Sequence, residues 1–276
     1  MKLLQMADST RFRTMTTEEL RSTFLVDDLF QPGQISLTYI DLDRTVLGSA
    51  VPTKEPLRLP TDDLLRAVYF TERRELGILN IGGAGKVTVN GVGFDLVNLD
   101  ALYVGRGNEE VVFSSDDPTH PAEFYLLSYP SHATWPTELI HSAEQAKTTL
   151  GTPETANLRT ITRLIHLEAT RSSQLVMGFT QLASGSVWNT MPAHTHNRRS
   201  EVYLYFDLDA DQRVIHLMGP GQETRNIVVA SKQVVVSPGW SVHAGVGTKN
   251  YTFCWGMGGE NQVYSDMDVI AIADLK

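Results

Sequence analysis

The sequence contains a single cysteine, Cys254, among its 276 residues. One cysteine cannot form a disulfide within the chain, so the fold does not depend on oxidation. No apolar run approaches the roughly 20 residues that a membrane-spanning helix needs. Residues 1–15 also lack an apolar core of signal-peptide length. We therefore expect a cytoplasmic protein.

The chain also has no basic stripe. It carries 23 Lys and Arg residues against 32 Asp and Glu residues, a net charge of −9. This balance argues against nucleic acid as a partner and leaves a small-molecule ligand open. The length allows one or two domains, and a chain of this size buries a core without disulfides or other covalent staples.

Most of the sequence consists of short β-rich runs that are separated by Gly, Pro or Asp, which is typical of a β-sandwich or barrel. Two short helices are predicted. Residues 16–30 begin with Thr16 and Glu19 at capping-box spacing. Residues 142–150 begin with Ser142 and Gln145 at the same spacing and are followed by a glycine that suits a helix end.

The two halves of the chain resemble each other. Residues 72–79 read ERRELGIL and residues 197–204 read NRRSEVYL. Each segment is followed by a Gly-containing hairpin region and a β-rich run that ends in a Gly-rich turn. The pattern predicts a duplicated β-barrel unit. The division falls in the polar stretch 145–160 and gives halves of 1–150 and 151–276.

A cluster of metal-ligand side chains lies in the second half. His194 and His196 alternate, so in a strand both point to the same side. Glu201 follows on the next strand, and His243 follows a Pro-Gly turn at 238–239. Three imidazoles and a carboxylate suit a first-row divalent ion such as zinc, manganese, iron or nickel. The other five histidines are expected to be structural or to lie in loops: His120, His132, His141, His166 and His216.

This pattern resembles the two cupin motifs, His-x-His with a Glu three or four residues later, and then a Pro/Gly turn followed by His. The departures are small: Gly239 is adjacent to its proline, and no glycine follows the motif glutamate. The resemblance implies an all-β, duplicated cupin (bicupin) fold, a barrel or jelly-roll sandwich with a few short helices. The repeat sets Tyr69 and Thr71 against His194 and His196, so the first half is expected to hold no metal.

Longer segments resemble one family, 5-keto-4-deoxyuronate isomerase, also called 4-deoxy-L-threo-5-hexosulose-uronate ketol-isomerase. These segments are 72–77, 80–85, 100–105, 188–196, 222–225, 241–249 and 255–263. The resemblance runs nearly end to end. It implies one zinc ion per chain on His194, His196, Glu201 and His243, and a homo-oligomer, a hexamer. The implied reaction, in pectin and uronate degradation, converts 5-dehydro-4-deoxy-D-glucuronate to 3-deoxy-D-glycero-2,5-hexodiulosonate.

Such an isomerisation needs a proton-transfer residue and a group that binds the substrate carboxylate. Tyr203 and Tyr205 share the face of Glu201, and Glu223 is a third candidate for proton transfer; packed barrel aromatics are the alternative interpretation of the tyrosines. The candidates for carboxylate binding are Arg198, Arg199, Arg225 and Lys249. Two other functions stay open: a metal-dependent cupin dioxygenase, and a non-enzymatic sugar-binding cupin.

Overall fold

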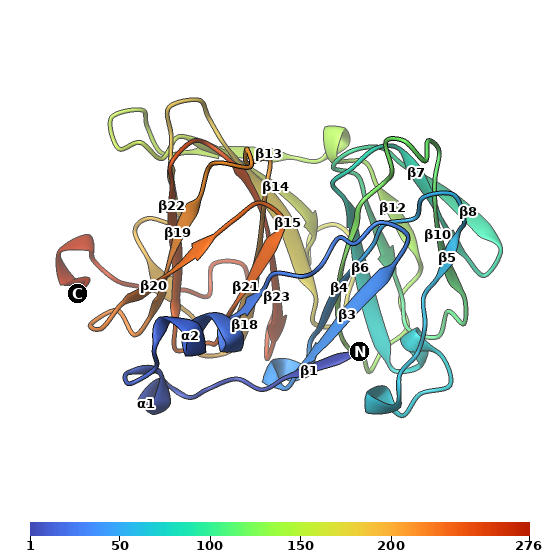
Figure 1. The fold of residues 1–276 in the computed structure, drawn as a ribbon, viewed down its shortest axis with the longest axis horizontal. Coiled ribbons are helices and arrows are strands. Elements are labelled where there is room, and N and C mark those ends of the chain that lie inside the picture. The colour runs from blue at the N-terminus through green and yellow to red at the C-terminus, as the bar shows by residue number, and fades with distance from the viewer. The chain divides into compact units, whose positions relative to one another are not determined.

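The computed structural model describes all of residues 1–276 and consists mainly of β-strands (Figure 1). None of its helices is long and apolar enough to cross a membrane. The chain forms two compact units, and each unit draws on separate stretches of sequence. The first comprises Met1–Leu4, Asp28–Gln145 and Leu164–Val176; the second comprises Gln5–Asp27, Ala146–Arg163 and Met177–Lys276.

The first unit contains a seven-stranded and a four-stranded sheet. In spatial order the larger sheet is β1 (Lys2–Leu4), β3 (Ile35–Ile40), β4 (Val46–Ala50), β11 (Phe124–Pro130), β6 (Arg74–Asn80), β9 (Ala101–Val104) and β12 (Glu138–Ile140). The smaller is β5 (Leu57–Arg58), β10 (Val111–Ser115), β7 (Gly85–Val89) and β8 (Val92–Leu96). Along the sequence, short 3-10 turns connect strands at Leu42–Arg44, Asp63–Leu65, Phe70–Glu72 and Ser142–Glu144.

Apolar side chains form the main buried core of the first unit. Leu76 and Ile78 alternate along β6 and pack in one buried cluster with Val87, Phe113 and Phe124. The buried carboxylates of this unit, Glu75 and Asp100, lie outside the cluster, and none of its histidines is buried. Burial of apolar side chains drives folding at roughly 25 cal/mol per Å² of apolar surface. The first unit therefore has a packed apolar core.

The second unit repeats this plan. Its seven-stranded sheet is β13 (Lys147–Leu150), β14 (Arg159–Ile165), β15 (Val176–Leu182), β23 (Thr252–Gly259), β18 (Arg199–Phe206), β21 (Gln233–Ser237) and β2 (Leu25–Val26). Its four-stranded sheet is β16 (Trp188–Asn189), β22 (Val242–Gly247), β19 (Val214–Gly219) and β20 (Arg225–Val229). A two-stranded ribbon joins β17 (His194–Thr195) to β24 (Asp268–Val269), and a 3-10 turn follows at Ile272–Asp274.

The strand orders confirm the predicted duplication. β6 lies between β11 and β9, and β18 lies between β23 and β21, in the same relative order. Both strands begin at the second arginine of the repeated pair, Arg74 in β6 and Arg199 in β18. With this register, Leu76 stands at the position of Glu201. An apolar side chain thus replaces the carboxylate in the first unit.

Residues 5–27, near the N-terminus, belong to the second unit. They form α1 (Ser9–Phe12), α2 (Thr17–Phe24) and β2, which pairs with β21. The capping box of Thr16 and Glu19 is present as predicted, but the helix ends at Phe24 rather than continuing to residue 30. The sequence is therefore not divided between the units at one position near residue 150. Residues 5–27 belong to the second unit, and residues 164–176 belong to the first.

The helix predicted at 142–150 is wrong. Ser142–Glu144 forms one 3-10 turn, and β13 follows at Lys147–Leu150, paired with β14. Thr148 and Thr149 are β-branched and favour an extended backbone, which suits the pairing with β14. Serine and glutamine at capping-box spacing do not make a helix when no apolar stripe follows them.

Candidate metal centre

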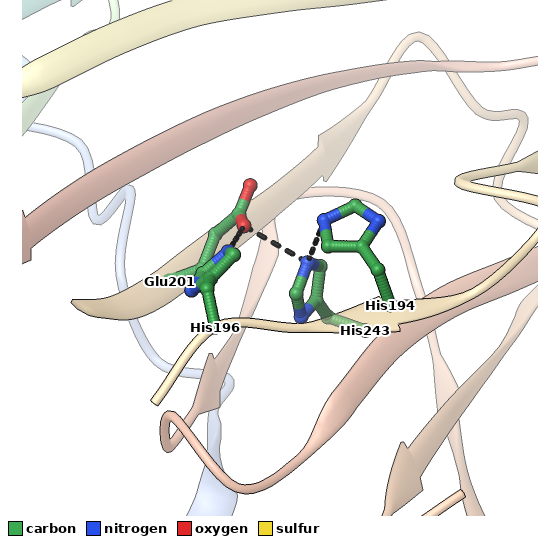
Figure 2. A group of neighbouring side chains, drawn as sticks. All are labelled: His194, His196, Glu201 and His243. Carbon is green, nitrogen blue, oxygen red and sulfur yellow. Dashed lines mark hydrogen bonds and ion pairs between the residues drawn. The ribbon is translucent and has the colours of Figure 1, made fainter. Parts of the chain in front are cut away.

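Four side chains from separate β-segments converge at one point in the second unit (Figure 2). His194 lies on β17, His196 directly follows it, Glu201 lies on β18 and His243 on β22. Their ligand atoms all lie within 4.8 Å of one another. Nε2 of His243 is 3.0 Å from Nε2 of His194 and 2.9 Å from Oε2 of Glu201. Nε2 of His196 is 2.8 Å from the same carboxylate oxygen.

The backbone fixes which nitrogen of each ring faces the centre. Nδ1 of His196 is 3.1 Å from the carbonyl oxygen of Arg199, and Nδ1 of His243 is 3.3 Å from that of Ser241. A carbonyl can only accept a hydrogen bond, so Nδ1 carries a proton in each of these two rings. Each Nε2 then faces the centre, which is the orientation found around bound metal ions.

The protonation of the group fits a cation. Burial opposes charge on Glu201, but the charge of His243 and the hydrogen bonds from His196 and His243 outweigh it and hold the pKa of Glu201 well below its ordinary value. Burial, reinforced by His243, lowers the pKa of His194 to about 3. The carboxylate is ionised and His194 is neutral at physiological pH. The four residues thus fit a divalent first-row ion.

A glycine brings the two ligand segments together. The turn at 238–239 precedes His243 and packs against the segment that carries His196. A Cβ at Gly239 would lie 3.0 Å from both the Cα of Asn197 and the carbonyl oxygen of His196. Only glycine fits this approach without displacement of one segment, so the turn residue directly serves the geometry of the centre.

A cavity of about 270 Å³ opens beside the four side chains, close to the lower end of the volumes of ligand pockets. Three of the four, His194, His196 and Glu201, line it. Its apolar wall consists of Leu150, Ile161, Met191, Pro192, Phe253, Trp255, Met257, Met267 and Val269. Its remaining polar residues are Arg159, Thr180, Thr190, Arg199, Tyr203 and Tyr264. The centre therefore faces a mostly apolar space with a few polar groups.

The residues predicted for proton transfer occupy three different environments. Tyr203 lines the cavity, and its hydroxyl is 2.9 Å from Oγ1 of Thr190. Tyr205 is also buried on the inner face of β18, but it does not line the cavity, and its hydroxyl is 2.7 Å from Nδ1 of His216. Glu223 lies outside the cavity with a side chain 43% exposed and pairs with Arg13 at 3.2 Å.

Of the four residues predicted to bind the substrate carboxylate, only one lines the cavity. Arg199 lines the cavity and is buried. Arg198 points away from it and pairs with Asp266 and Asp268. The other two predicted residues do not line the cavity either: Arg225 donates to the carbonyl oxygens of Phe12 and Met15, and Lys249 pairs with the exposed Asp209.

Four polar cavity residues are absent from the sequence prediction: Arg159, Thr180, Thr190 and Tyr264. Arg159 falls at the end of the polar stretch 145–160, and Tyr264 lies in the C-terminal segment after the last β-rich run. A signal for Arg159 existed, because Arg159, Ile161 and Arg163 alternate with threonines or a leucine along one strand. No comparable signal marks Tyr264.

A duplicated β-barrel with two histidines, a glutamate and a third histidine at this spacing defines a cupin. Solved cupin-like structures are similar to this chain. An IolB-like protein from Salmonella typhimurium LT2 matches with a TM-score of 0.70 at 14% identity, covering 90% of this chain and 96% of that one. Oxalate decarboxylase from Bacillus subtilis, described with Mn(II) centres, matches with a TM-score of 0.55 at 11% identity, covering 81% and 71%.

Within this class the chain belongs to the KduI/IolB family, whose model matches residues 26–272. Its relatives include proteins named 4-deoxy-L-threo-5-hexosulose-uronate ketol-isomerase. The one from Formosa agariphila is 56% identical over 94% of this chain and 93% of its own length. The one from Lachnoclostridium phytofermentans is 48% identical over 100% of both chains.

Proposed function

We propose that the chain is a ketol-isomerase that converts 5-dehydro-4-deoxy-D-glucuronate to 3-deoxy-D-glycero-2,5-hexodiulosonate in the degradation of pectin and related uronates. The names of relatives that are about half identical over nearly the whole length support this substrate and product. The observation that carries an enzymatic role is the convergence of four metal-ligand atoms beside an apolar-walled cavity.

We further propose that His194, His196, Glu201 and His243 hold one zinc ion per chain. Such an ion would act as a Lewis acid that polarises the substrate carbonyl and stabilises the charge that develops on an enediolate. The chain's own part is to bring three imidazoles and one carboxylate together at one point. The apolar wall excludes water, and this strengthens each electrostatic contact inside the cavity.

Tyr203 is the proposed proton-transfer residue among the three predicted from sequence, because it alone lines the cavity. Burial, together with the charge of Glu201, raises the pKa of its phenol well above 10, so the hydroxyl keeps its proton at neutral pH. A phenol in this state can donate a hydrogen bond or a proton to a substrate oxygen that gains charge and can recover it afterwards. Thr190 orients that hydroxyl from the cavity wall.

The test is a turnover assay on purified 5-dehydro-4-deoxy-D-glucuronate, with the product identified by NMR and the metal content measured on the same sample. We expect formation of the 2,5-diketo acid without oxygen uptake. Oxygen consumption with an oxidised product would instead identify a cupin dioxygenase. Binding of the sugar acid without turnover by the metal-loaded protein would identify a binding protein.

A further inference from the structure

The cavity contains more positive than negative charge. Two guanidinium groups, those of Arg159 and Arg199, line it, and an arginine stays protonated in proteins. The only carboxylate among the lining residues is Glu201, whose Oε2 already bonds to two imidazoles. No aspartate lines the cavity and no second glutamate does. The two arginines therefore lack an acidic partner within it.

Arg199 has donors that nothing in the chain satisfies. The residue is only 2% exposed, and the one hydrogen bond of its side chain runs from Nη2 to the carbonyl oxygen of Asp266 at 3.0 Å. Its Nε and Nη1 are buried without a partner. Arg199 lies two residues before Glu201 on β18 and so shares the inward face of that strand. Buried unpaired donors of a charged group are costly, and an acceptor that enters the cavity would remove that cost.

The first unit offers an internal comparison at the same position. Arg74 begins β6 as Arg199 begins β18, and it too is buried. Its Nε donates to Oγ of Ser128 at 3.1 Å, and its Nη2 donates to the carbonyl oxygens of Ser128 at 2.9 Å and Arg44 at 2.6 Å. The fold can thus satisfy this arginine from its own chain. In the second unit the corresponding donors are left free, next to the cavity.

Arg159 approaches the cavity from β14. It is half-buried, and its one hydrogen bond runs from Nη1 to the carbonyl oxygen of Asn157 at 2.9 Å. It forms no ion pair, in contrast to Arg198, whose guanidinium is engaged by two aspartates. The remaining nitrogens of Arg159 are available to a ligand.

We propose that Arg159 and Arg199 together form an anion subsite that binds the carboxylate of the substrate. This inference rests on the proposed function for the choice of substrate and extends it to the residues that recognise the acid. A planar guanidinium binds a carboxylate through two parallel hydrogen bonds. With the carboxylate held there, the other end of an open-chain sugar acid is directed toward the four-residue centre. The subsite would select acids over neutral sugars of the same shape.

The test compares D-glucuronate with its neutral amide, D-glucuronamide, as ligands of the metal-loaded protein, by calorimetry and by saturation-transfer NMR. We expect the wild type to bind the acid about 10- to 100-fold more tightly than the amide, the range for hydrogen bonds to a charged group. Arg159→Met and Arg199→Met should each reduce that preference at least tenfold, while binding of the amide changes little. Metal content and thermal unfolding are measured on every variant.

The matched control is Arg213→Met. Arg213 is an exposed arginine of the same unit, and it donates only to nearby backbone carbonyls in its side-chain contacts. Its loss should leave the preference for acid intact. Because Arg199 is buried, Arg199→Lys is prepared as well; it keeps the charge and loses the planar fork, so an intermediate preference is expected.

Two results would overturn the subsite: a wild type that does not prefer the acid, or Arg159 and Arg199 variants that fold and keep the wild-type preference. Turnover of 5-dehydro-4-deoxy-D-glucuronate is measured separately on the same wild-type sample. Normal turnover without a preference for acid rejects the subsite alone. A clear preference without turnover rejects the isomerase alone.

Discussion

At the scale of single residues, His194 and His196 make the most direct prediction. Replacing both with Ala removes two of four converging ligands, and we expect the purified double variant to carry less than about a tenth of the wild-type metal, since each lost ligand weakens binding by an order of magnitude or more. Elemental analysis after dialysis measures this. His132→Ala, an exposed histidine outside the centre, serves as the control. Full occupancy in the double variant would reject the centre.

Metal affinity should depend on pH with a defined sign. Burial lowers the pKa of His196, but its hydrogen bond to Glu201, the charge of Glu201 and its hydrogen bond to the Arg199 backbone together outweigh burial and raise that pKa above the ordinary 6.5. His194, with a pKa of about 3, is already neutral. Metal binding below the raised pKa of His196 therefore has to displace the proton of that ring. Affinity should fall about tenfold per pH unit on acidification, and turnover should be lost with the metal below roughly pH 5; competition with a chelator measures it.

Two single variants distinguish the proposed role of Tyr203 from that of Tyr205. Tyr203→Phe should lower kcat by about 10²- to 10⁴-fold with metal content unchanged, the range for loss of one proton-transfer group. Tyr205→Phe removes a hydroxyl outside the cavity lining and should reduce stability more than kcat. Steady-state kinetics and thermal unfolding on both variants give the answer. The reverse ranking in kcat would move the role to Tyr205.

The sequence predicts the four converging residues but not the whole cavity, for a physical reason. His194 and His196 are two residues apart and Glu201 follows after a short turn, so their spacing in the sequence is enough to predict that they lie close together. Arg159 reaches the cavity only because β14 lies in the same sheet as β18, and the order of strands in a sheet is not encoded in any local pattern. The place of Arg199 in the cavity lining, by contrast, is predictable because it precedes Glu201 by two residues and shares its face of the strand.

At the scale of one element, the capping box of α2 provides a stability prediction. Oγ1 of Thr16 accepts from the backbone N–H of Glu19 at 3.2 Å, and the Glu19 carboxylate accepts from the N–H of Thr16 at 2.7 Å. Thr16→Ala should cost about 1 kcal/mol of unfolding free energy, measured by urea denaturation. Ser22→Ala, an exposed change on the same helix, should cost much less. Equal effects would show that the cap does not contribute.

The same motif shows what local patterns can predict. Thr16 and Glu19 precede Leu20 and Phe24, which are buried at helical spacing, so cap and apolar stripe agree. Ser142 and Gln145 have the spacing without the stripe, and that segment folds as a turn and a strand. Pairing with β14, a contact that no local rule contains, decides its structure.

At the scale of the whole molecule, the two units make opposite use of one position. Glu201 holds the centre, and Leu76 occupies the matching place in an apolar core. Leu76→Glu should destabilise the protein by on the order of 3–5 kcal/mol, because it buries a carboxylate without a partner. It should leave metal content at one ion per chain, since no imidazole lies in that core. Denaturant unfolding and elemental analysis measure both. A second ion bound by this variant would contradict the comparison of the two units.

The duplication itself was predictable from two aligned eight-residue segments, 72–79 and 197–204, together with the β-rich runs that follow them, whereas the extent of each unit was not. A repeat shows which segments are equivalent, but it does not show where a terminal segment adds to a sheet. The pairing of β2 with β21 joins residues at opposite ends of the chain, and it is decided by which strand edge is left open after the rest has folded.

Because of that pairing, the N-terminal strand β2 cannot join its sheet until most of the chain has been synthesised on the ribosome. Leu25 emerges about 210 residues before its partner Val235. At about 5–20 residues per second the delay is roughly 10–40 s. During this time Phe12 and Phe24 lack their aromatic partner Trp240, so their rings stay exposed to solvent or are bound by a chaperone. A fragment that starts after residue 27 would avoid this delay, but it would also leave the strand edge of β21 unpaired and prone to aggregation.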